Sequence, residues 1–439
     1  MLLRIHAAVV FLFLLFLLDQ TRAGCPANFT ASTSVPGKCY LHTTSDNFAH
    51  AVRTCRRLVK GADILAIANG FENAEIASLL QTTWKISTAF TGNVFSDNAP
   101  HWLAYAARNS TYSNWIEGNF NGNYAFIGPT GAWGPIDVYS FKHAICQFYP
   151  DDPTTFPPPE PNCPSGWSAS MSVQGKCYRY GPTIDQFDFF EATRQCLSTK
   201  GSELLTIGSQ LELMEAWETS NWWPWTALAR YEDGQNWRWV ETMHPTNYTG
   251  PAEPPIGTDG NCSYLAKFSF LSIPCAAQRT FICQHFTNET APPTPISLSC
   301  PQNGIASVTN PGTCYYVLNQ TSGFDAARAG CKALSTGFKN NDLFVPRNPA
   351  ELEEFQALFH FHNNTTIGCR RSSRTSSWTW VAQRDSPFSN RWCSGQPDNA
   401  QYPNDRCALV IANPSAFCWT AGDCTDSTRV GVCQSSNTF

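Results

Sequence analysis

The sequence predicts an α+β protein made of three tandem repeats that are held together by disulfides. Three observations support this fold class. Pairs of cysteines recur at a constant interval, an amphipathic helical pattern follows each pair, and each repeat ends in an apolar residue followed by Cys-Gln. The residue patterns inside a repeat indicate two helices, short strands and a long loop region.

Each repeat begins with two cysteines that are fourteen residues apart. The pairs start at Cys25, Cys163 and Cys300, and the second cysteine of each pair lies in a Gly-x-Cys-Tyr tetrapeptide. The repeat starts are separated by 138 and then 137 residues. A spacing this regular indicates duplicated domains.

An amphipathic helix is expected after each cysteine pair. A Phe-x-x-Ala-x-x-x-Cys pattern places three residues on one helical face and turns the cysteine inward. The pattern occurs at Phe48, Ala51 and Cys55, at Phe189, Ala192 and Cys196, and at Phe324, Ala327 and Cys331.

A strand and a second helix are expected next. Apolar alternation predicts the strands at Leu65 and Ile67, at Leu205 and Ile207, and at Leu343 and Val345. The second helix is clearest in PAELEEFQALF, because Pro349 suits a first helical turn. The rest of each repeat is rich in Trp, Gly, Asn and Ser, which favours short strands and long loops, and the repeats close at Gln147, Gln284 and Gln434.

Proline-rich segments without apolar periodicity separate the repeats and indicate extended, semi-stiff spacers. The predicted organisation has a signal peptide at 1–23, domains at 24–148, 163–285 and 300–435, and linkers at 149–162 and 286–299.

The N-terminus and the cysteine count predict a secreted protein. The apolar run from about Ala7 to Leu18 is too short to span a bilayer comfortably, and its flank suits cleavage after Ala23; a retained signal anchor is the alternative. The 19 cysteines indicate an oxidising compartment. Candidate glycosylation sequons begin at Asn28, Asn109, Asn247, Asn261, Asn288, Asn319, Asn363 and Asn364.

Composition and motifs point to a binding protein and not to an enzyme. Charged residues make up 14% of the chain and the net charge is −5, which argues against a nucleic-acid binder. The sequence has no Gly-x-Ser-x-Gly, His-Glu-x-x-His or phosphate-binding glycine loop. The one close histidine pair, His360 and His362, is better explained by chance than by zinc binding.

These motifs resemble the C-type lectin-like domain family in its long form, which has an extra N-terminal hairpin cystine. The resemblance covers nearly the whole chain after residue 23. It implies that each domain has two helices, two small antiparallel sheets and a long loop region. It also places the family's Trp-Ile-Gly-Leu core strand at Trp102-Leu103-Ala104, at Trp225-Thr226-Ala227-Leu228 and at Thr366-Ile367-Gly368-Cys369.

The resemblance also implies a set of disulfides: Cys25–Cys39, Cys55–Cys146, Cys163–Cys177, Cys196–Cys283, Cys262–Cys275, Cys300–Cys314, Cys331–Cys433 and Cys407–Cys424. The bond from the helix to the last strand closes a loop of about 90–100 residues, which contributes about 4–5 kcal/mol in the chain-entropy model. Cys369, Cys393 and Cys418 are left over. Since three is odd, a disulfide-linked oligomer, an unusual pairing and a buried thiol all remain open.

Sugar binding in this family uses a calcium ion held by the long loop, and calcium requires six to eight oxygen ligands. The family supplies them from an x-Pro-x tripeptide with a cis proline, an acidic residue two positions before the inner cysteine, and an Asn-Asp pair after a tryptophan. The third domain has Gln396-Pro397-Asp398, which implies a galactose-type preference, and it has Asp405 before Cys407.

The third domain departs from the family pattern after Trp419, where Thr420 and Ala421 replace the Asn-Asp pair. Asp423 could compensate only if the loop were rearranged. The predicted calcium ligands are therefore Gln396, Asp398 and Asp405, which would make a weak site. Trp392 and Tyr402 are candidates either for stacking on a sugar or for packing.

The first two domains are poor calcium sites. The second retains only Glu253-Pro254-Pro255, has Gly260 in place of the acidic ligand, and carries the Asn261 sequon beside Cys262. The first has neither the tripeptide nor the inner cystine. Both are expected to be spacers or to bind protein.

The sequence therefore predicts a secreted lectin-like recognition protein that binds glycans or glycoproteins, with the third domain as the best candidate site. A calcium-independent scaffold for protein interactions is the competing hypothesis, because the Asn-Asp pair is missing from all three domains. Neither nucleic-acid binding nor a membrane span is expected.

Overall fold

A computed structural model describes residues 24–59, 61–96, 99–102, 110–117, 122–137, 140–150, 162–182, 186–220, 223–230, 236–239, 260–266, 269–287, 299–319, 322–359, 365–373, 376–381, 392–397, 405–413 and 416–437. The predicted signal peptide and most of both linkers lie outside these ranges. The chain forms two compact units, one of Met1–Cys177 with Ser209–Asn221 and one of Tyr178–Gly208 with Trp222–Phe439. Within the described ranges, no helix is long and apolar enough to span a bilayer.

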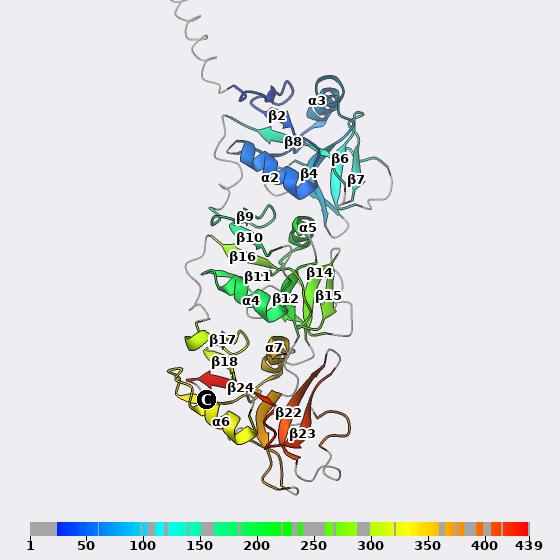
Figure 1. Cartoon of the computed structure of the whole chain (residues 1–439). Coiled ribbons are helices and arrows are strands. Elements are labelled where there is room, and N and C mark those ends of the chain that lie inside the picture. The colour runs from blue at the N-terminus through cyan, green and yellow to red at the C-terminus, as the bar shows by residue number, and fades with distance from the viewer. Residues whose placement is uncertain are drawn as a thin grey trace, which may run out of the picture. The chain divides into compact units, whose positions relative to one another are not determined.

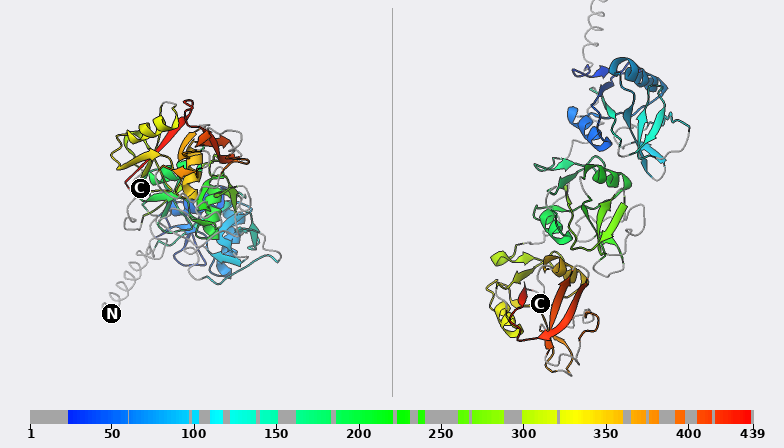
Figure 2. Two further views of the ribbon diagram at one scale, coloured as in Figure 1. Left: turned by 90° about the horizontal axis from the view of Figure 1, so that it is seen from below. Right: turned by 45° about the vertical axis from the view of Figure 1, so that its right-hand side comes forward.

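The predicted fold class is confirmed, because each repeat contains two α-helices and small antiparallel sheets (Figure 1). Figure 2 shows the helices and strands of each repeat from two further directions. The first helices are α2 (Phe48–Leu58), α4 (Phe189–Leu197) and α6 (Phe324–Lys332), as the Phe-Ala-Cys pattern predicts. Asn47 and Asp188 cap the first two by accepting hydrogen bonds from the backbone N–H groups of His50 and Glu191.

The second helices are α3 (Gly70–Leu79), α5 (Gln210–Thr219) and α7 (Pro349–Phe359). The helix predicted from Pro349 is confirmed over its full length. Helix α3 continues into a π-helical turn, η1 (Leu80–Trp84). Asn69, Ser209 and Asn348 cap these helices through backbone N–H groups of the first turn.

The first and third repeats have the same sheet topology. In the first repeat the strand order is β1-β2-β8-β4-β6-β7, with β3 paired to β8 and β5 paired to β4. In the third repeat it is β17-β18-β24-β20-β22-β23, with β19 paired to β24 and β21 paired to β20. In each, a parallel contact, β4 with β8 or β20 with β24, joins two antiparallel sheets. The strands are β1 (Thr30–Ala31), β2 (Cys39–His42), β3 (Asp63–Ile64), β4 (Ala89–Ser96), β5 (Ala99–Trp102), β6 (Tyr124–Ile127), β7 (Trp133–Ile136), β8 (His143–Phe148), β17 (Ile305–Ala306), β18 (Thr313–Val317), β19 (Asn340–Leu343), β20 (Thr365–Arg370), β21 (Thr379–Trp380), β22 (Asp405–Asn413), β23 (Ala416–Asp423) and β24 (Val430–Ser436).

The second repeat has shorter strands. Strand β11 pairs antiparallel with β16, and β12 pairs with both β13 and β14, with β15 beyond β14. Its strands are β9 (Ser168–Ala169), β10 (Lys176–Tyr180), β11 (Ser202–Leu204), β12 (Trp225–Ala229), β13 (Arg238–Trp239), β14 (Cys262–Ala266), β15 (Ser269–Ile273) and β16 (Ile282–Phe286). A short 3-10 helix, η2 (Pro301–Asn303), opens the third repeat.

The core strand predicted in the first repeat is wrong. Trp102 ends the hairpin strand β5, and residues 103–104 lie outside the described ranges. The strand that pairs in parallel with the closing strand is β4, which begins at Ala89 and Phe90. Phe90 is fully buried and meets the Phe48 ring edge-on, so packing against the first helix identifies the core strand although it lacks the expected tryptophan. In the other repeats the expected strands are β12 and β20.

The strands predicted from apolar alternation end earlier than expected. Strand β3 ends at Ile64 and β11 ends at Leu204, whereas Leu65, Ile67, Leu205 and Ile207 follow them. These residues are fully buried. The apolar alternation therefore indicates an extended segment of the core that continues beyond the paired strand.

Nine disulfides are present among the described residues, and eight of them join the same cysteines as the family resemblance implies. The ninth joins two of the left-over cysteines, Cys393 and Cys418. The third, Cys369, lies in β20 with only 4% of its surface exposed. Of the interpretations left open by the sequence, the structure therefore favours the buried thiol.

Burial raises the pKa of the Cys369 thiol to about 12. Because the thiolate is the reactive form, we expect the native chain to resist alkylation by iodoacetamide in a mildly alkaline buffer. The same reagent should add a single label once the protein is unfolded without reductant, as intact-mass spectrometry would show. Labelling of the native protein, or a dimer on a non-reducing gel that reductant dissolves, would contradict this assignment.

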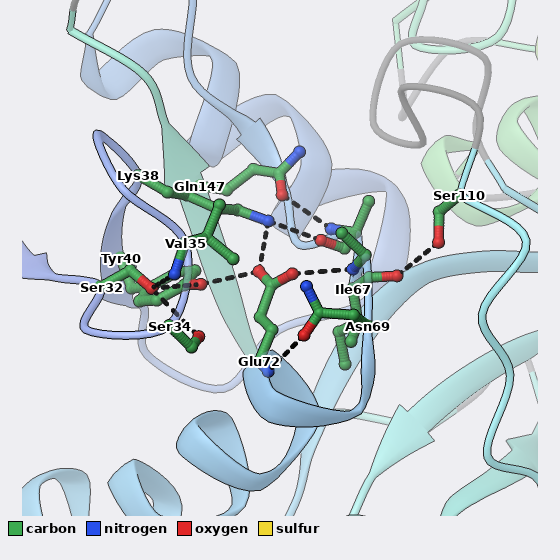
Figure 3. Close-up of polar contacts among 12 residues, drawn as sticks. Ser32, Ser34, Val35, Lys38, Tyr40, Ile67, Asn69, Glu72, Ser110 and Gln147 are labelled. Carbon is green, nitrogen blue, oxygen red and sulfur yellow. Dashed lines mark hydrogen bonds and ion pairs between the residues drawn. The ribbon is translucent and has the colours of Figure 1, made fainter.

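A buried glutamate in the first turn of the second helix organises each repeat. In the first repeat, the Glu72 carboxylate is fully buried and forms an ion pair with Lys38. The Tyr40 hydroxyl donates to Glu72 Oε1 at 2.7 Å, and the Ala68 N–H donates to Oε2 at 2.7 Å. Figure 3 shows the Lys38 ammonium and the Tyr40 hydroxyl converging on this carboxylate. Burial and the nearby carboxylate raise the pKa of Tyr40 above its ordinary range, so the hydroxyl stays a donor.

The other two repeats contain the same arrangement. Lys176 forms a buried ion pair with Glu212, and Arg347 donates to Glu351 Oε1 at 2.9 Å. The Tyr315 hydroxyl also donates to Glu351, at 3.0 Å. In each repeat the carboxylate therefore ties the second helix to a basic side chain of the same repeat.

Replacing one partner of such a pair should be costly, because the other charge is left buried without compensation. We expect Lys38→Met to destabilise the first repeat by about 3–5 kcal/mol. The double variant Lys38→Met/Glu72→Leu should recover most of that loss, since it removes both charges. Differential scanning calorimetry of the full chain measures both effects, and equal destabilisation in the two variants would argue against the ion pair.

Candidate functional site

The candidate site lies in the third repeat, where a disulfide holds the Gln-Pro-Asp loop against β23. The Cys393–Cys418 bond makes this link, and the Cys393 N–H donates to the Trp419 carbonyl at 2.9 Å. The Gln396 N–H donates to the Cys393 carbonyl at 2.8 Å, which closes a turn. The Gln396–Pro397 peptide bond is cis, as the family pattern implies.

The structure places Gln396 against the strand on which the family carries its Asn-Asp pair. Gln396 Oε1 accepts a hydrogen bond from the Ala421 N–H at 3.1 Å. Ala421 has no oxygen in its side chain, and Thr420 contributes only a hydroxyl. The backbone N–H of the substituted position thus contacts the amide oxygen expected to bind calcium.

The side chain of Asp423, at the end of this strand, makes hydrogen bonds within its own loop. Asp423 accepts from both the N–H and the hydroxyl of Thr425 at 2.9 Å, and these bonds lower the pKa of its carboxyl. Asp405 lies opposite Asp423 in the β22–β23 pairing, and Asp398 lies outside the described residues. No group of three or more metal-ligating acidic, histidine or cysteine side chains occurs within the described ranges.

Of the two candidate stacking residues, only Trp392 is described. Its ring lies 4.6 Å from that of Trp378, and it packs against a buried core that includes Trp419. Trp392 therefore packs within its own domain, whereas Tyr402 lies outside the described residues.

A cavity of about 610 Å³ opens at the end of the same sheet, and the sequence analysis missed it. Its lining residues are Asp325, Arg370, Arg371, Ser372, Arg406, Asp423, Cys424 and Thr425. They come from the ends of β20 and β23, the start of β22 and the first turn of α6. The only signal in the sequence is the Arg370-Arg371 pair, which the structure brings beside Arg406 through the pairing of β20 with β22.

The three arginines of this cavity differ in how they are held. Arg371 is only 3% exposed, and its guanidinium lies 5.0 Å from the centre of the Trp378 ring. Arg370 Nη1 donates to Asp325 at 2.9 Å, but that aspartate is 82% exposed. Arg406 Nη1 donates to the Ser372 carbonyl at 3.3 Å. Three arginines face two aspartates, so the lining has an excess of positive charge.

The comparisons with known proteins agree with this architecture. The chain is 28% identical over 270 residues to human lymphocyte antigen 75 and 24% identical over the same length to the mouse protein. This similarity supports a C-type lectin-like family for the chain. The matched region covers 59% of this chain but only 15% of each relative's length. No protein-family model matches the chain.

Single lectin-like domains of known structure also match. Human lithostathine is 19% identical, and the match covers 30% of this chain and 94% of that one, with a TM-score of 0.27. The C-type lectin domain of murine dendritic cell inhibitory receptor 2, solved in complex with an N-glycan, is 20% identical. That match covers 31% of this chain and 99% of that one, with a TM-score of 0.26.

The second lectin-like domain has no room for the acidic ligand that the sequence shows to be missing. A Cβ atom at Gly260 would lie 1.8 Å from the carbonyl carbon of Ile273. The neighbouring sequon residue, Asn261, uses its side-chain nitrogen to donate to Glu353 at 3.0 Å. This nitrogen is the atom to which a glycan would be attached, and residues 253–255 lie outside the described ranges.

Restoring an acidic residue should therefore damage the second domain without creating a calcium site. We expect Gly260→Asp to lower the stability of this domain by about 2 kcal/mol or more, because the backbone near Ile273 must move. Thermal unfolding with and without calcium measures the effect. Gly24→Asp is the control, because a side chain at Gly24 would meet open space. A calcium-dependent rise in the Tm of Gly260→Asp would contradict the steric explanation.

Proposed function

We propose that this chain is an extracellular recognition protein whose third lectin-like domain binds carbohydrate that carries an acidic group. The observation that carries the proposal is the cavity lined by Arg370, Arg371 and Arg406. Guanidinium groups bind carboxylate and sulfate groups through paired, charge-assisted hydrogen bonds. A sulfated, sialylated or uronic-acid glycan supplies such a group together with hydroxyls for the polar rim.

The distribution of charge supports an anionic ligand. The carboxylate of Asp423 is occupied by Thr425, so it competes little for the arginines. Asp325 is largely exposed, and it forms an ion pair with Arg370. An ion pair at a protein surface contributes about 0–1 kcal/mol to stability. An incoming anion can replace it at small cost. Arg371 is fixed by burial against Trp378 and gives the cavity a preorganised cationic wall.

Calcium at Gln396, Asp398 and Asp405 and a galactose preference remain predictions from the sequence. The hydrogen bond from the Ala421 N–H to Gln396 Oε1, at the position where the family carries a ligand, supports recognition without calcium. We propose that this recognition is independent of calcium. Secretion, glycosylation and the absence of enzymatic activity are part of the same proposal, and the nine disulfides support an extracellular location.

The second candidate function is a protein-interaction scaffold formed by the first two domains. The observation that favours it is Gly260, since the tight contact with Ile273 excludes the family's acidic ligand from the second domain. Proteins that carry lectin-like folds without calcium sites can still present their loop surfaces to other proteins.

Glycan-array binding of the full chain, expressed in an oxidising host, tests the proposed function. We expect retention on acidic glycans, little retention on neutral galactosides, and no change when a calcium chelator is added. Arg406→Gln should weaken binding about 10-fold to 100-fold, because charge-assisted hydrogen bonds contribute about 1.5–3 kcal/mol.

Lys339→Gln is the matched control, since it removes one positive charge from an exposed position outside the cavity. Galactose binding that a chelator abolishes and that Arg406→Gln leaves intact would favour the calcium site instead. Absence of binding to every glycan would favour the protein scaffold.

A further inference from the structure

The second helix of each lectin-like domain carries a second glutamate one turn after the buried one. These residues are Glu75, Glu215 and Glu354, and each accepts hydrogen bonds from a short hydroxyl-rich loop between the first two strands of its domain. The loops are residues 32–34, 170–172 and 307–309, and we call each glutamate with its loop a socket.

The sockets of the second and third domains are buried and nearly identical. Glu215 accepts from the Ser170 hydroxyl at 2.7 Å, the Met171 N–H at 2.7 Å and the Ser172 hydroxyl at 2.6 Å. Glu354 accepts from the corresponding residues of its own loop: Ser307 at 2.6 Å, the Val308 N–H at 2.9 Å and Thr309 at 2.6 Å. Both carboxylates have no exposed surface.

Each of these two sockets also holds an arginine from the preceding domain. Arg53 Nη2 donates to Glu215 Oε1 at 2.9 Å, and Arg194 Nη1 donates to Glu354 Oε1 at 2.8 Å. Both arginines lie two residues before the helix cysteine, at Cys55 and Cys196, so they project from the same turn of α2 and α4. An arginine side chain thus occupies the same socket in two domains. In each case the arginine and the glutamate are at least 160 residues apart in the sequence.

The socket of the first domain has the same hydrogen bonds but lacks the arginine. Glu75 accepts from the Ser32 hydroxyl at 2.7 Å and from the Thr33 hydroxyl at 2.8 Å, and it also contacts the Ser34 hydroxyl. No cation contacts Glu75 among the described residues, and its side chain is partly exposed. Although partial burial acts in the opposite direction, these hydrogen bonds lower the pKa of Glu75 to about 2, so the carboxylate is ionised at neutral pH.

We propose that the Glu75 socket is a docking site for an arginine on the first helix of a lectin-like domain other than the three in this chain. The two filled sockets define the partner by its chemistry, which is an arginine two residues before the helix cysteine. This inference is independent of the proposed glycan binding.

The third domain of a second copy of this chain does not supply that arginine. Ala329, which is exposed, occupies the corresponding position before Cys331. The neighbouring Lys332 keeps a basic residue where the first domain has Arg56, whose Nη1 donates to the Met171 carbonyl at 3.0 Å. A single substitution at Ala329 therefore converts α6 into the helix that the Glu75 socket fits.

Sedimentation velocity of the full chain tests the socket with Ala329→Arg. We expect this variant to associate head to tail as its concentration rises. Under the same conditions Ala329→Gln, which adds a polar side chain without the charge, should sediment as the unmodified chain does. Adding Glu75→Gln to Ala329→Arg should weaken association at least about tenfold, because the arginine then lacks a carboxylate.

Glu75→Gln also changes the hydrogen bonds to the loop at residues 32–34. Glu75→Asp therefore serves as a second variant, which keeps the negative charge on a side chain that is one methylene shorter. Circular dichroism checks that both variants are folded. The proposal is overturned if Ala329→Arg associates no more than Ala329→Gln. It is also overturned if association persists unchanged with both Glu75 substitutions, since the contact would then lie elsewhere.

Discussion

The buried carboxylate in the first turn of each second helix is the interaction on which the rest of the structure depends. Glu72, Glu212 and Glu351 each face a basic side chain of their own domain. Such a pair adds little net stability compared with apolar packing, but leaving one charge unmatched is costly, so it penalises any other placement of the helix. Because the helix is fixed in this way, its next turn presents the second glutamate at a defined place. One interior ion pair thus sets both the core of a domain and the surface that it offers to a neighbour.

The features predicted correctly from the sequence depend on local spacing. Helices α2, α4 and α6 follow from a periodic Phe, Ala and Cys pattern, and the cysteine spacing recurs in every domain. The core strand of the first domain was not predicted correctly. Strand β4 is defined by its parallel contact with β8 and by the packing of Phe90 on Phe48, and no local motif encodes either contact. The Cys393–Cys418 bond was missed for a related reason, since the other domains contain no counterpart from which to infer it.

The candidate site shows the same division. The Gln396-Pro397 turn could be found because its motif is contiguous, but its contact with Ala421 depends on how two distant segments meet. The arginine-lined cavity escaped notice because strand pairing, and not sequence proximity, brings Arg406 beside Arg370 and Arg371. The loss of an acidic residue at Gly260 was visible in the sequence, whereas the contact with Ile273 that forbids its return was not.

The pairing of the second strand of a domain with its last strand has a consequence for how such proteins arise. Thr313 near the start of the third domain lies opposite Ser436 near its end, and Cys39 lies opposite Phe148 in the first. In these two domains, segments near the beginning and the end of the domain therefore lie side by side in one sheet. A domain of this kind is easily duplicated, because an extra copy can be inserted between two others without disrupting the fold of either. Lineages can lengthen or shorten such arrays by whole units while each unit keeps its own core intact.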